Sequence, residues 1–288
     1  MADSSIEATQ PIETLIVNQL AADSGLVSGA HALAALLYAA LALWCWRSQP
    51  QQRLLHGFMV IPIVLQAVGL WAALWSPSVM HISFAVVLSL SLWLALLIYW
   101  FEAWRINVGG LSPFLLPVAV LAALAPAIYS ETRPLAHTHS LGFQVHFLLA
   151  MLAYSLFTLA ALYTVFMGVC EKALHRRQAS RLLIGLPPLL SMEALLFRLL
   201  WVAFVFLSAA LASGLLFSEE IFGRALRFEH KTLFGFVAWG IFATLLAGRH
   251  FYGWRGKRAQ YLTLAGFLAL LLAYVGTRFI LEILLGRI

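Results

Sequence analysis

Histidine is the residue type in this chain best suited to chemistry. The nine histidines fall into two groups by their position relative to the apolar segments. A neutral imidazole can ligate iron, copper or zinc through one ring nitrogen. One group lies among cations, where we expect solvated loop residues: His56, His175 and His250. The other group lies at the opposite ends of the apolar segments: His31, His81, His137, His139, His146 and His230.

His146 has the most apolar surroundings of the second group. It lies inside a long apolar run, and Leu149, Ala150 and Tyr154 follow on the same face of a helix. A polar ring in this position needs a partner, because an unsatisfied polar group in hydrocarbon is costly. The partner is either a group on a neighbouring helix or a ligand, and both interpretations stay open.

His230 lies in a charged cluster, Glu229-His230-Lys231, directly before another apolar segment. At the start of a helix it can also be an ordinary residue of the membrane interface. Two histidines from different helices at one membrane face could bind a planar metallocofactor on its two axial sides. His146 and His230 are therefore the candidate cofactor- and metal-binding residues, and no catalytic residue is predicted.

The remaining histidines of this group carry weaker signals. His137 and His139 form a His-x-His pair without a nearby cysteine or acidic cluster, so we expect solvated loop residues. His31 and His81 are expected at the level of the lipid headgroups. Whether any of these four has a role stays open.

The elements that must position these residues are membrane helices. The chain has 288 residues, 62% hydrophobic and only 10% charged, with a mean hydropathy of +0.91. Soluble domains carry about 25% charged residues, and about 20 apolar residues cross a bilayer core. Eight continuous apolar stretches approach that length: 26–46, 58–75, 82–101, 113–129, 143–169, 196–217, 232–248 and 261–284. Continuous rather than alternating runs favour an all-α polytopic membrane protein with about eight transmembrane helices.

The cations predict the orientation of these helices. Twelve of the 18 Lys and Arg residues fall at one set of helix ends and six at the other. An excess of positive charge marks the cytoplasm, so both termini are predicted to be periplasmic. Residues 1–25 form a polar extracytoplasmic tail without Lys or Arg, which argues against a cleavable signal peptide. Residues 26–288 form the membrane domain of a multi-pass protein in a bacterial inner membrane.

Two further features limit the function. The net charge of +6 comes without basic runs that contain interleaved aromatics, so no nucleic-acid partner is expected. Cys45 and Cys170 both lie at the predicted cytoplasmic end, where thiols stay reduced.

Three segments together resemble the CcsA/HemX-type cytochrome c assembly superfamily. The first is the histidine-led run from His146 to Tyr163, and the second runs from Pro187 to Arg198 before a helix that ends at Ala212-Ser213-Gly214. The third runs from Glu229 to Trp239 and is followed by Gly253-Trp-Arg-Gly-Lys-Arg-Ala259. Their order and spacing cover roughly residues 140–280.

The resemblance implies an eight-span protein that handles haem, with periplasmic histidines as axial ligands. His146 matches the histidine that opens this helix in the family, and His230 falls beside the position of a second. The family's tryptophan-rich haem-handling motif is absent, because residues 218–231 contain no Trp. Ala247 stands where full-length ligases carry an intramembrane histidine. Full haem–cytochrome ligase activity is therefore not expected, and an enzyme is the less favoured class.

The function predicted from these observations is a haem-binding or accessory protein of cytochrome and haem biogenesis, with haem as cofactor and cytochrome-biogenesis proteins as partners. Two alternatives stay open. The chain could be a scaffold or regulator whose cytoplasmic loop 170–195 binds an enzyme of haem synthesis. It could also be a small-molecule permease, for which Pro62 and Pro126 within the spans are the only hints.

Overall fold

The computed structural model describes residues 10–48, 50–74, 81–105, 111–128, 133–134, 140–175, 189–216 and 230–273. These residues form eight helices and one pair of very short strands. The helices are α1 (Gln10–Ser48), α2 (Gln52–Leu74), α3 (Phe84–Arg105), α4 (Ser112–Ile128), α5 (Leu141–His175), α6 (Leu189–Leu216), α8 (His230–Tyr252) and α9 (Lys257–Leu271). The strands are β1 (His81–Ile82) and β2 (Arg133–Pro134), which pair in antiparallel fashion.

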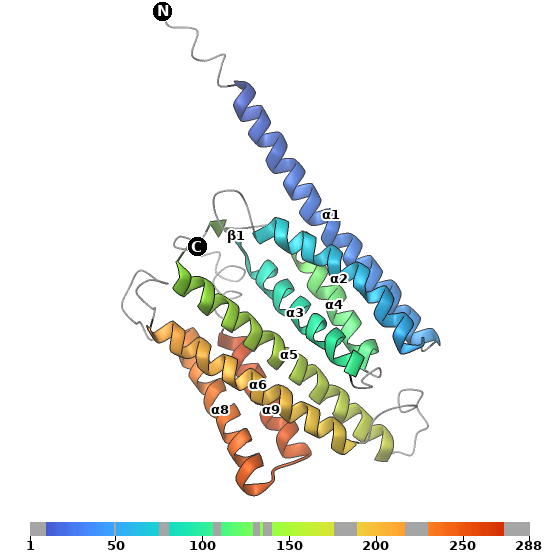
Figure 1. Ribbon diagram of the computed structural model, residues 1–288, viewed down its shortest axis with the longest axis vertical. Helices are drawn as coiled ribbons and strands as arrows, with labels where there is room; N and C mark the ends of the chain where they lie inside the picture. Colours follow the sequence, from blue (N-terminus) through green and yellow to red (C-terminus); the bar gives the residue numbers. More distant parts are fainter. Residues whose placement is uncertain are drawn as a thin grey trace, which may run out of the picture.

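The helices form two groups that meet along α5. In the first group α1 packs against α2 and α4, and α3 against α4; in the second α5 packs against α6 and α9, and α8 against α6 and α9. Helix α3 packs against α5 and so joins the groups. Consecutive helices run in opposite directions (Figure 1). One end of the molecule, here called the cation-rich end, therefore contains the helix termini that flank residues 48–52, 105–112, 175–189 and 252–257. The start of α5, the end of α6 and the start of α8 lie at the opposite end.

Six of the described helices are long and apolar enough to cross a membrane. They are Gly25–Ser48, Gln52–Leu74, Ala85–Trp104, Leu141–His175, Leu189–Leu216 and Thr232–Tyr252. Helix α4 is a shorter apolar helix of 17 residues, and α9 has 15 residues. The all-α class and the multi-pass architecture are confirmed. Which end faces the cytoplasm stays a prediction that rests on the distribution of cations.

The first helix is longer than predicted. Helix α1 begins at Gln10, so much of the segment predicted as a polar tail continues the helix of the first span. Figure 1 shows this N-terminal part of α1 extending beyond the other helices.

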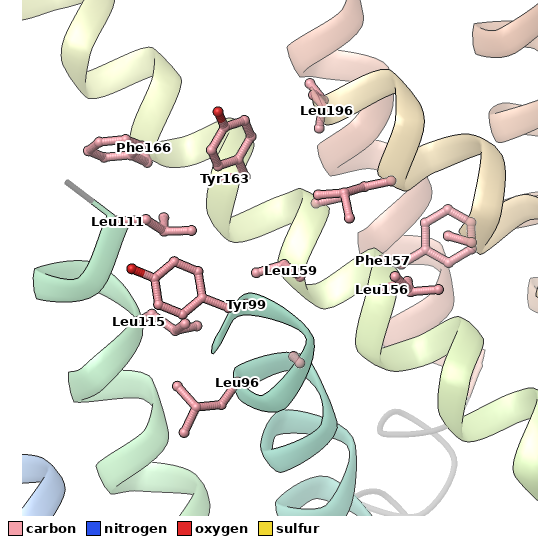
Figure 2. Packing of buried hydrophobic residues seen from close by; sticks show 14 of the residues in the cluster. Leu96, Tyr99, Leu111, Leu115, Leu156, Phe157, Leu159, Tyr163, Phe166 and Leu196 are labelled. Carbon is pink, nitrogen blue, oxygen red and sulfur yellow. The ribbon is translucent and has the colours of Figure 1, made fainter. Parts of the chain in front are cut away.

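Close packing of aromatic and aliphatic side chains fixes α5 against helices of both groups. Figure 2 shows Tyr99 and Leu111 facing Leu159 and Tyr163 of α5. Between α5 and α8 the rings of Phe157 and Phe242 stack with their centroids 3.9 Å apart. Membrane helices associate largely through such van der Waals contacts, because lipid offers no hydrophobic driving force between them. Helix α5 is thereby fixed on several sides, which matters because it carries His146.

One prediction about the histidines is wrong, and a second histidine is more buried than the sequence indicated. His56 was expected to be a solvated loop residue, but α2 begins four residues before it and its side chain is 2% exposed, against the rings of Tyr99 and Trp104. His31 was expected at the level of the headgroups; it is completely buried in the helix bundle, and its level in the bilayer stays a prediction. Its Nδ1 lies 2.8 Å from the carbonyl oxygen of Val27. His175 and His250 are exposed, as expected for the cation-rich end, although both belong to the last turns of helices.

Candidate functional site

His146 lies in the second turn of α5 and contacts the last part of α6. The start of α5 is fixed by Ser140, whose hydroxyl accepts a hydrogen bond from the backbone N–H of Phe143 at 3.2 Å, as in a helix N-cap. The imidazole is half-buried. Its Nδ1 lies 3.1 Å from the carbonyl oxygen of Ala210 and 3.1 Å from the hydroxyl oxygen of Ser213. The partner on a neighbouring helix that the sequence required is therefore present.

These partners determine which nitrogen of His146 carries the proton. A carbonyl oxygen can only accept, so Nδ1 must be the donor toward Ala210. The Ser213 hydroxyl donates to the same carbonyl at 2.9 Å, which leaves its oxygen to accept from Nδ1. In the neutral ring the lone pair then belongs to Nε2. A histidine that ligates a metal is commonly held in this way, with its second nitrogen donating to a carbonyl.

A glycine on α6 makes room for the ring. A Cβ atom added at Gly214 would lie 3.2 Å from Cε1 and 3.5 Å from Nδ1 of His146. The lower value is tighter than ordinary van der Waals contact, so a larger residue would press on the imidazole. One turn of α6, from Ala210 to Gly214, thus supplies both the acceptors and the space that orient His146.

His230 is the first residue of α8, and the fold brings it to the same end of the molecule as His146. The register between α6 and α8 is shown by Trp239, whose Nε1 donates to the Ser208 hydroxyl at 2.9 Å, and by Gly235, which lies beside Leu211. The side chain of His230 lies outside the described residues. Joint ligation by His146 and His230 therefore stays a prediction.

The other histidines predicted at this end are described only in part. His81 belongs to β1, where it is paired with Pro134, but its side chain is not among those described. His137 and His139 lie outside the described residues. Within the described part of the chain, no group of three or more His, Cys, Asp or Glu residues is placed to hold a metal ion.

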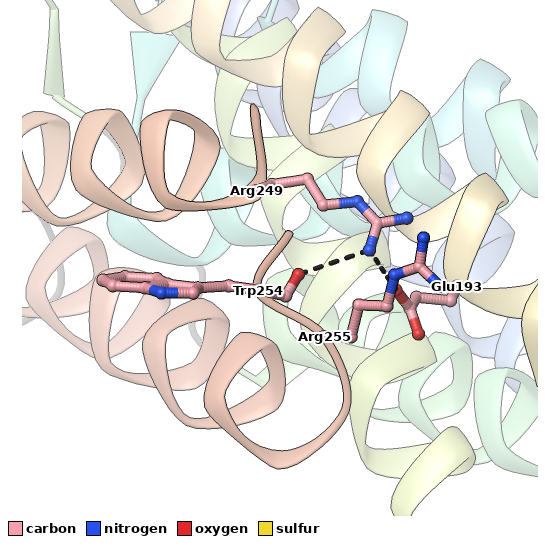
Figure 3. A network of polar contacts seen from close by, with 4 residues as sticks. All are labelled: Glu193, Arg249, Trp254 and Arg255. Carbon is pink, nitrogen blue, oxygen red and sulfur yellow. Dashed lines mark hydrogen bonds and ion pairs between the residues drawn. The ribbon is translucent and has the colours of Figure 1, made fainter. Parts of the chain in front are cut away.

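A polar network at the cation-rich end was not predicted from the sequence. Nη1 of Arg249 lies 2.6 Å from Oε1 of Glu193 and 3.3 Å from the carbonyl oxygen of Trp254, and Nε of Arg255 lies 3.8 Å from the same carboxylate oxygen (Figure 3). The network joins α6 to the turn between α8 and α9. It links two of the segments that carry the family resemblance. In the sequence, this network was indicated by no more than one carboxylate, Glu193, and one guanidinium, Arg249, in otherwise apolar runs.

Comparison with known proteins identifies the family. The model of the cytochrome C assembly protein family matches residues 34–285. The chain belongs to this family. The predicted family is thereby confirmed, although it does not by itself show that this chain binds haem.

Two relatives of this family member align over much of the chain. A 28.8 kDa protein described as uncharacterized, from Azospirillum brasilense, is 32% identical over 187 residues, which are 64% of this chain and 68% of the relative. The inner membrane protein YpjD of Escherichia coli K12 is 29% identical over 174 residues, 59% of this chain and 65% of YpjD. The chain is thus YpjD-like, and the name of this relative agrees with the predicted inner-membrane localisation.

A third relative aligns over a shorter part of the chain. The cytochrome c biogenesis protein CcsA of Heterosigma akashiwo is 33% identical over 92 residues, which cover 32% of this chain and 29% of CcsA. The alignments thus span about two thirds of the first two relatives and less than a third of CcsA. No solved structure matches the chain.

Proposed function

We propose that this protein binds haem at the extracytoplasmic face of a bacterial inner membrane, as an accessory protein of cytochrome c and haem biogenesis without full ligase activity. His146 and His230 are the residues that would hold the haem iron. The observation that carries the proposal is the fixed orientation of His146, whose Nδ1 faces Ala210 and Ser213.

The residues present fit a haem group in their donor chemistry. Haem supplies its own equatorial nitrogens, so the protein needs to provide only axial ligands, and histidine is a common one. The contacts of Nδ1 place the lone pair of neutral His146 on Nε2, the nitrogen that would ligate iron. The polypeptide's contribution is to hold this imidazole in one tautomer and one orientation, between α5 and α6.

The accessory role follows from what the chain lacks in sequence relative to the ligases of its family. Residues 218–231 contain no Trp, and position 247 is Ala. A protein that holds haem near the membrane surface could still deliver it, protect it or report its presence to partners. CcsA is named a cytochrome c biogenesis protein, and the match to it supports this process for the chain.

An absorbance spectrum tests the proposal. The full chain is purified in detergent from haem-replete cells, its spectrum is recorded, and haem is then titrated into it. We expect a Soret band, and its loss in the double variant His146→Ala/His230→Ala. The double variant His175→Ala/His250→Ala, which changes two exposed histidines at the cation-rich end, should keep the band. A wild-type protein without a Soret band that also takes up no haem on titration would overturn the proposal.

A further inference from the structure

The turn between α8 and α9 is held in a defined conformation. Gly253 and Gly256 have φ values of 64° and 58°, in the left-handed region that glycine adopts without strain. Between them, the ring of Trp254 packs directly against Gly248 of α8, at a distance that leaves no room for a Cβ atom. The carbonyl oxygen of Trp254 accepts a hydrogen bond from Arg249. The turn is therefore a fixed surface feature of the cation-rich end.

This turn presents cations to the outside. Arg255, Lys257 and Arg258 are exposed, and 59% of the Arg255 side chain is accessible. The carboxylate beside them, Glu193, already receives the shorter contact from Arg249. Of the four cations of this region only Arg249 and Arg255 contact Glu193, and a second carboxylate, Glu171, is bonded to Gln260 of α9, so the cations exceed the carboxylates by two. An anionic partner is the natural complement of this surface.

Aromatic side chains surround these cations. Phe251, Tyr252 and Tyr261 are 75%, 78% and 72% exposed. Phe251 and Tyr252 end α8, one of the helices long enough to cross the membrane, and Tyr261 lies in the second turn of α9. Aromatic rings at such helix ends prefer the level of the lipid headgroups. The partner must therefore offer negative charge beside apolar chains.

We propose that this basic–aromatic turn, consisting of Arg255, Lys257 and Arg258 with Phe251, Tyr252 and Tyr261, binds the phosphate groups of anionic phospholipids. An anionic lipid brings phosphate to the cations and acyl chains to the aromatic rings at the same time. Basic residues directly next to a transmembrane helix favour anionic leaflets by about fivefold for each cation. An acidic protein segment would satisfy the charges alone and leave the aromatic rings uncovered.

Native mass spectrometry with defined lipids tests this proposal. The detergent-solubilised full chain is mixed with equal amounts of dioleoylphosphatidylglycerol and dioleoylphosphatidylcholine, and the ratio of the two adducts is measured. We expect wild type to prefer phosphatidylglycerol, and Arg255→Gln/Lys257→Gln/Arg258→Gln to lower the preference by about tenfold or more. The matched control Arg47→Gln/Arg53→Gln/Lys172→Gln removes three exposed cations from the same end and should lower the preference clearly less.

Two further measurements complete the test of lipid binding. The pair Lys257→Gln/Arg258→Gln leaves the contact of Arg255 with Glu193 in place, and it serves if the triple variant does not fold. Inorganic phosphate added in excess should not displace the lipid, because it lacks the acyl chains. Equal preference in wild type and the triple variant, an equal loss in the matched control, or full displacement by phosphate would each overturn the proposal. The readout does not involve haem, so it is independent of the proposed function.

Discussion

The orientation of His146 depends on residues that lie far from it in sequence. Ala210 is 64 positions further along the chain and Ser213 is 67 positions away. The sequence showed that an imidazole in an apolar helix needs a partner, and it identified the face of the helix. It could not name the partner, because the register between α5 and α6 is decided by packing along their whole length.

Ser213 should affect haem binding without touching the iron. In Ser213→Ala the hydroxyl that accepts from Nδ1 is lost, while the contact of Nδ1 with the Ala210 carbonyl remains. Loss of such a supporting hydrogen bond weakens ligation about tenfold or more. We therefore expect a haem Kd raised by about that factor, measured by titration at the Soret band. Ser208→Ala, on the same helix but bonded to Trp239, is the control and should bind as wild type does. Equal affinity in all three proteins would contradict this role.

Gly214 should affect haem binding because it leaves room for the His146 ring. In Gly214→Val the added atoms press on the His146 ring, since even a Cβ would lie 3.2 Å from Cε1. We expect a displaced imidazole and a clear loss of bound haem per chain in purified protein. Gly240→Val is the matched control, because nothing lies within 4 Å of a Cβ at that position. Equal haem content in the two variants would show that the space at Gly214 does not affect haem binding.

At the scale of the elements, the sequence predicts helices better than their limits and contacts. Continuous apolar runs located all eight described helices, because the bilayer imposes a minimum length on each span. They did not show that α1 begins at Gln10, since a helix can continue past the apolar part of a span. Nor did they show that His56 is buried, because a residue among cations near a span end can still lie inside the next helix.

Glu193 should stabilise the arrangement of α6 against the α8–α9 turn. Its side chain is 12% exposed and that of Arg249 is 23% exposed, so the pair is only partly screened by solvent. In Glu193→Gln the guanidinium of Arg249 loses its charged partner, and we expect the free energy of unfolding to fall by about 1–3 kcal/mol. The measurement is unfolding of the detergent-solubilised protein in denaturant.

The ion pair of Glu102 with Arg198 provides the control for this prediction. Its N–O distance is 3.7 Å and the Arg198 side chain is 58% exposed, so Glu102→Gln should change stability by less than about 1 kcal/mol. A Glu193→Gln protein as stable as wild type, or no more affected than Glu102→Gln, would show that the network is only a surface contact.

At the scale of the whole molecule, the alternation of helices brings nine of the twelve cations of one set, those within the described residues, to one end and the candidate site to the other. The count of cations predicts that the site end faces outward. Neither the helices nor the family match decides this, because the same bundle could be inserted in either direction. The orientation is therefore a separate prediction.

Cysteine labelling measures that orientation. Leu141→Cys lies at the start of α5 and Gln51→Cys beside the start of α2, both exposed, while the native Cys45 and Cys170 are buried and give little background. In spheroplasts, a membrane-impermeant maleimide should label the cysteine at 141 at once. It should label the cysteine at 51 only after lysis. The reverse pattern would place the candidate site in the cytoplasm.

The proposed function depends most directly on His146 as a ligand. The deciding measurement is the haem content per chain, from the Soret absorbance of purified protein after saturation with haem and removal of the excess. We expect wild type and the His250→Ala control to retain haem, and His146→Ala to lose most of it or to show a shifted band. Haem retained by His146→Ala with an unchanged spectrum would contradict the assignment of His146 as an axial ligand.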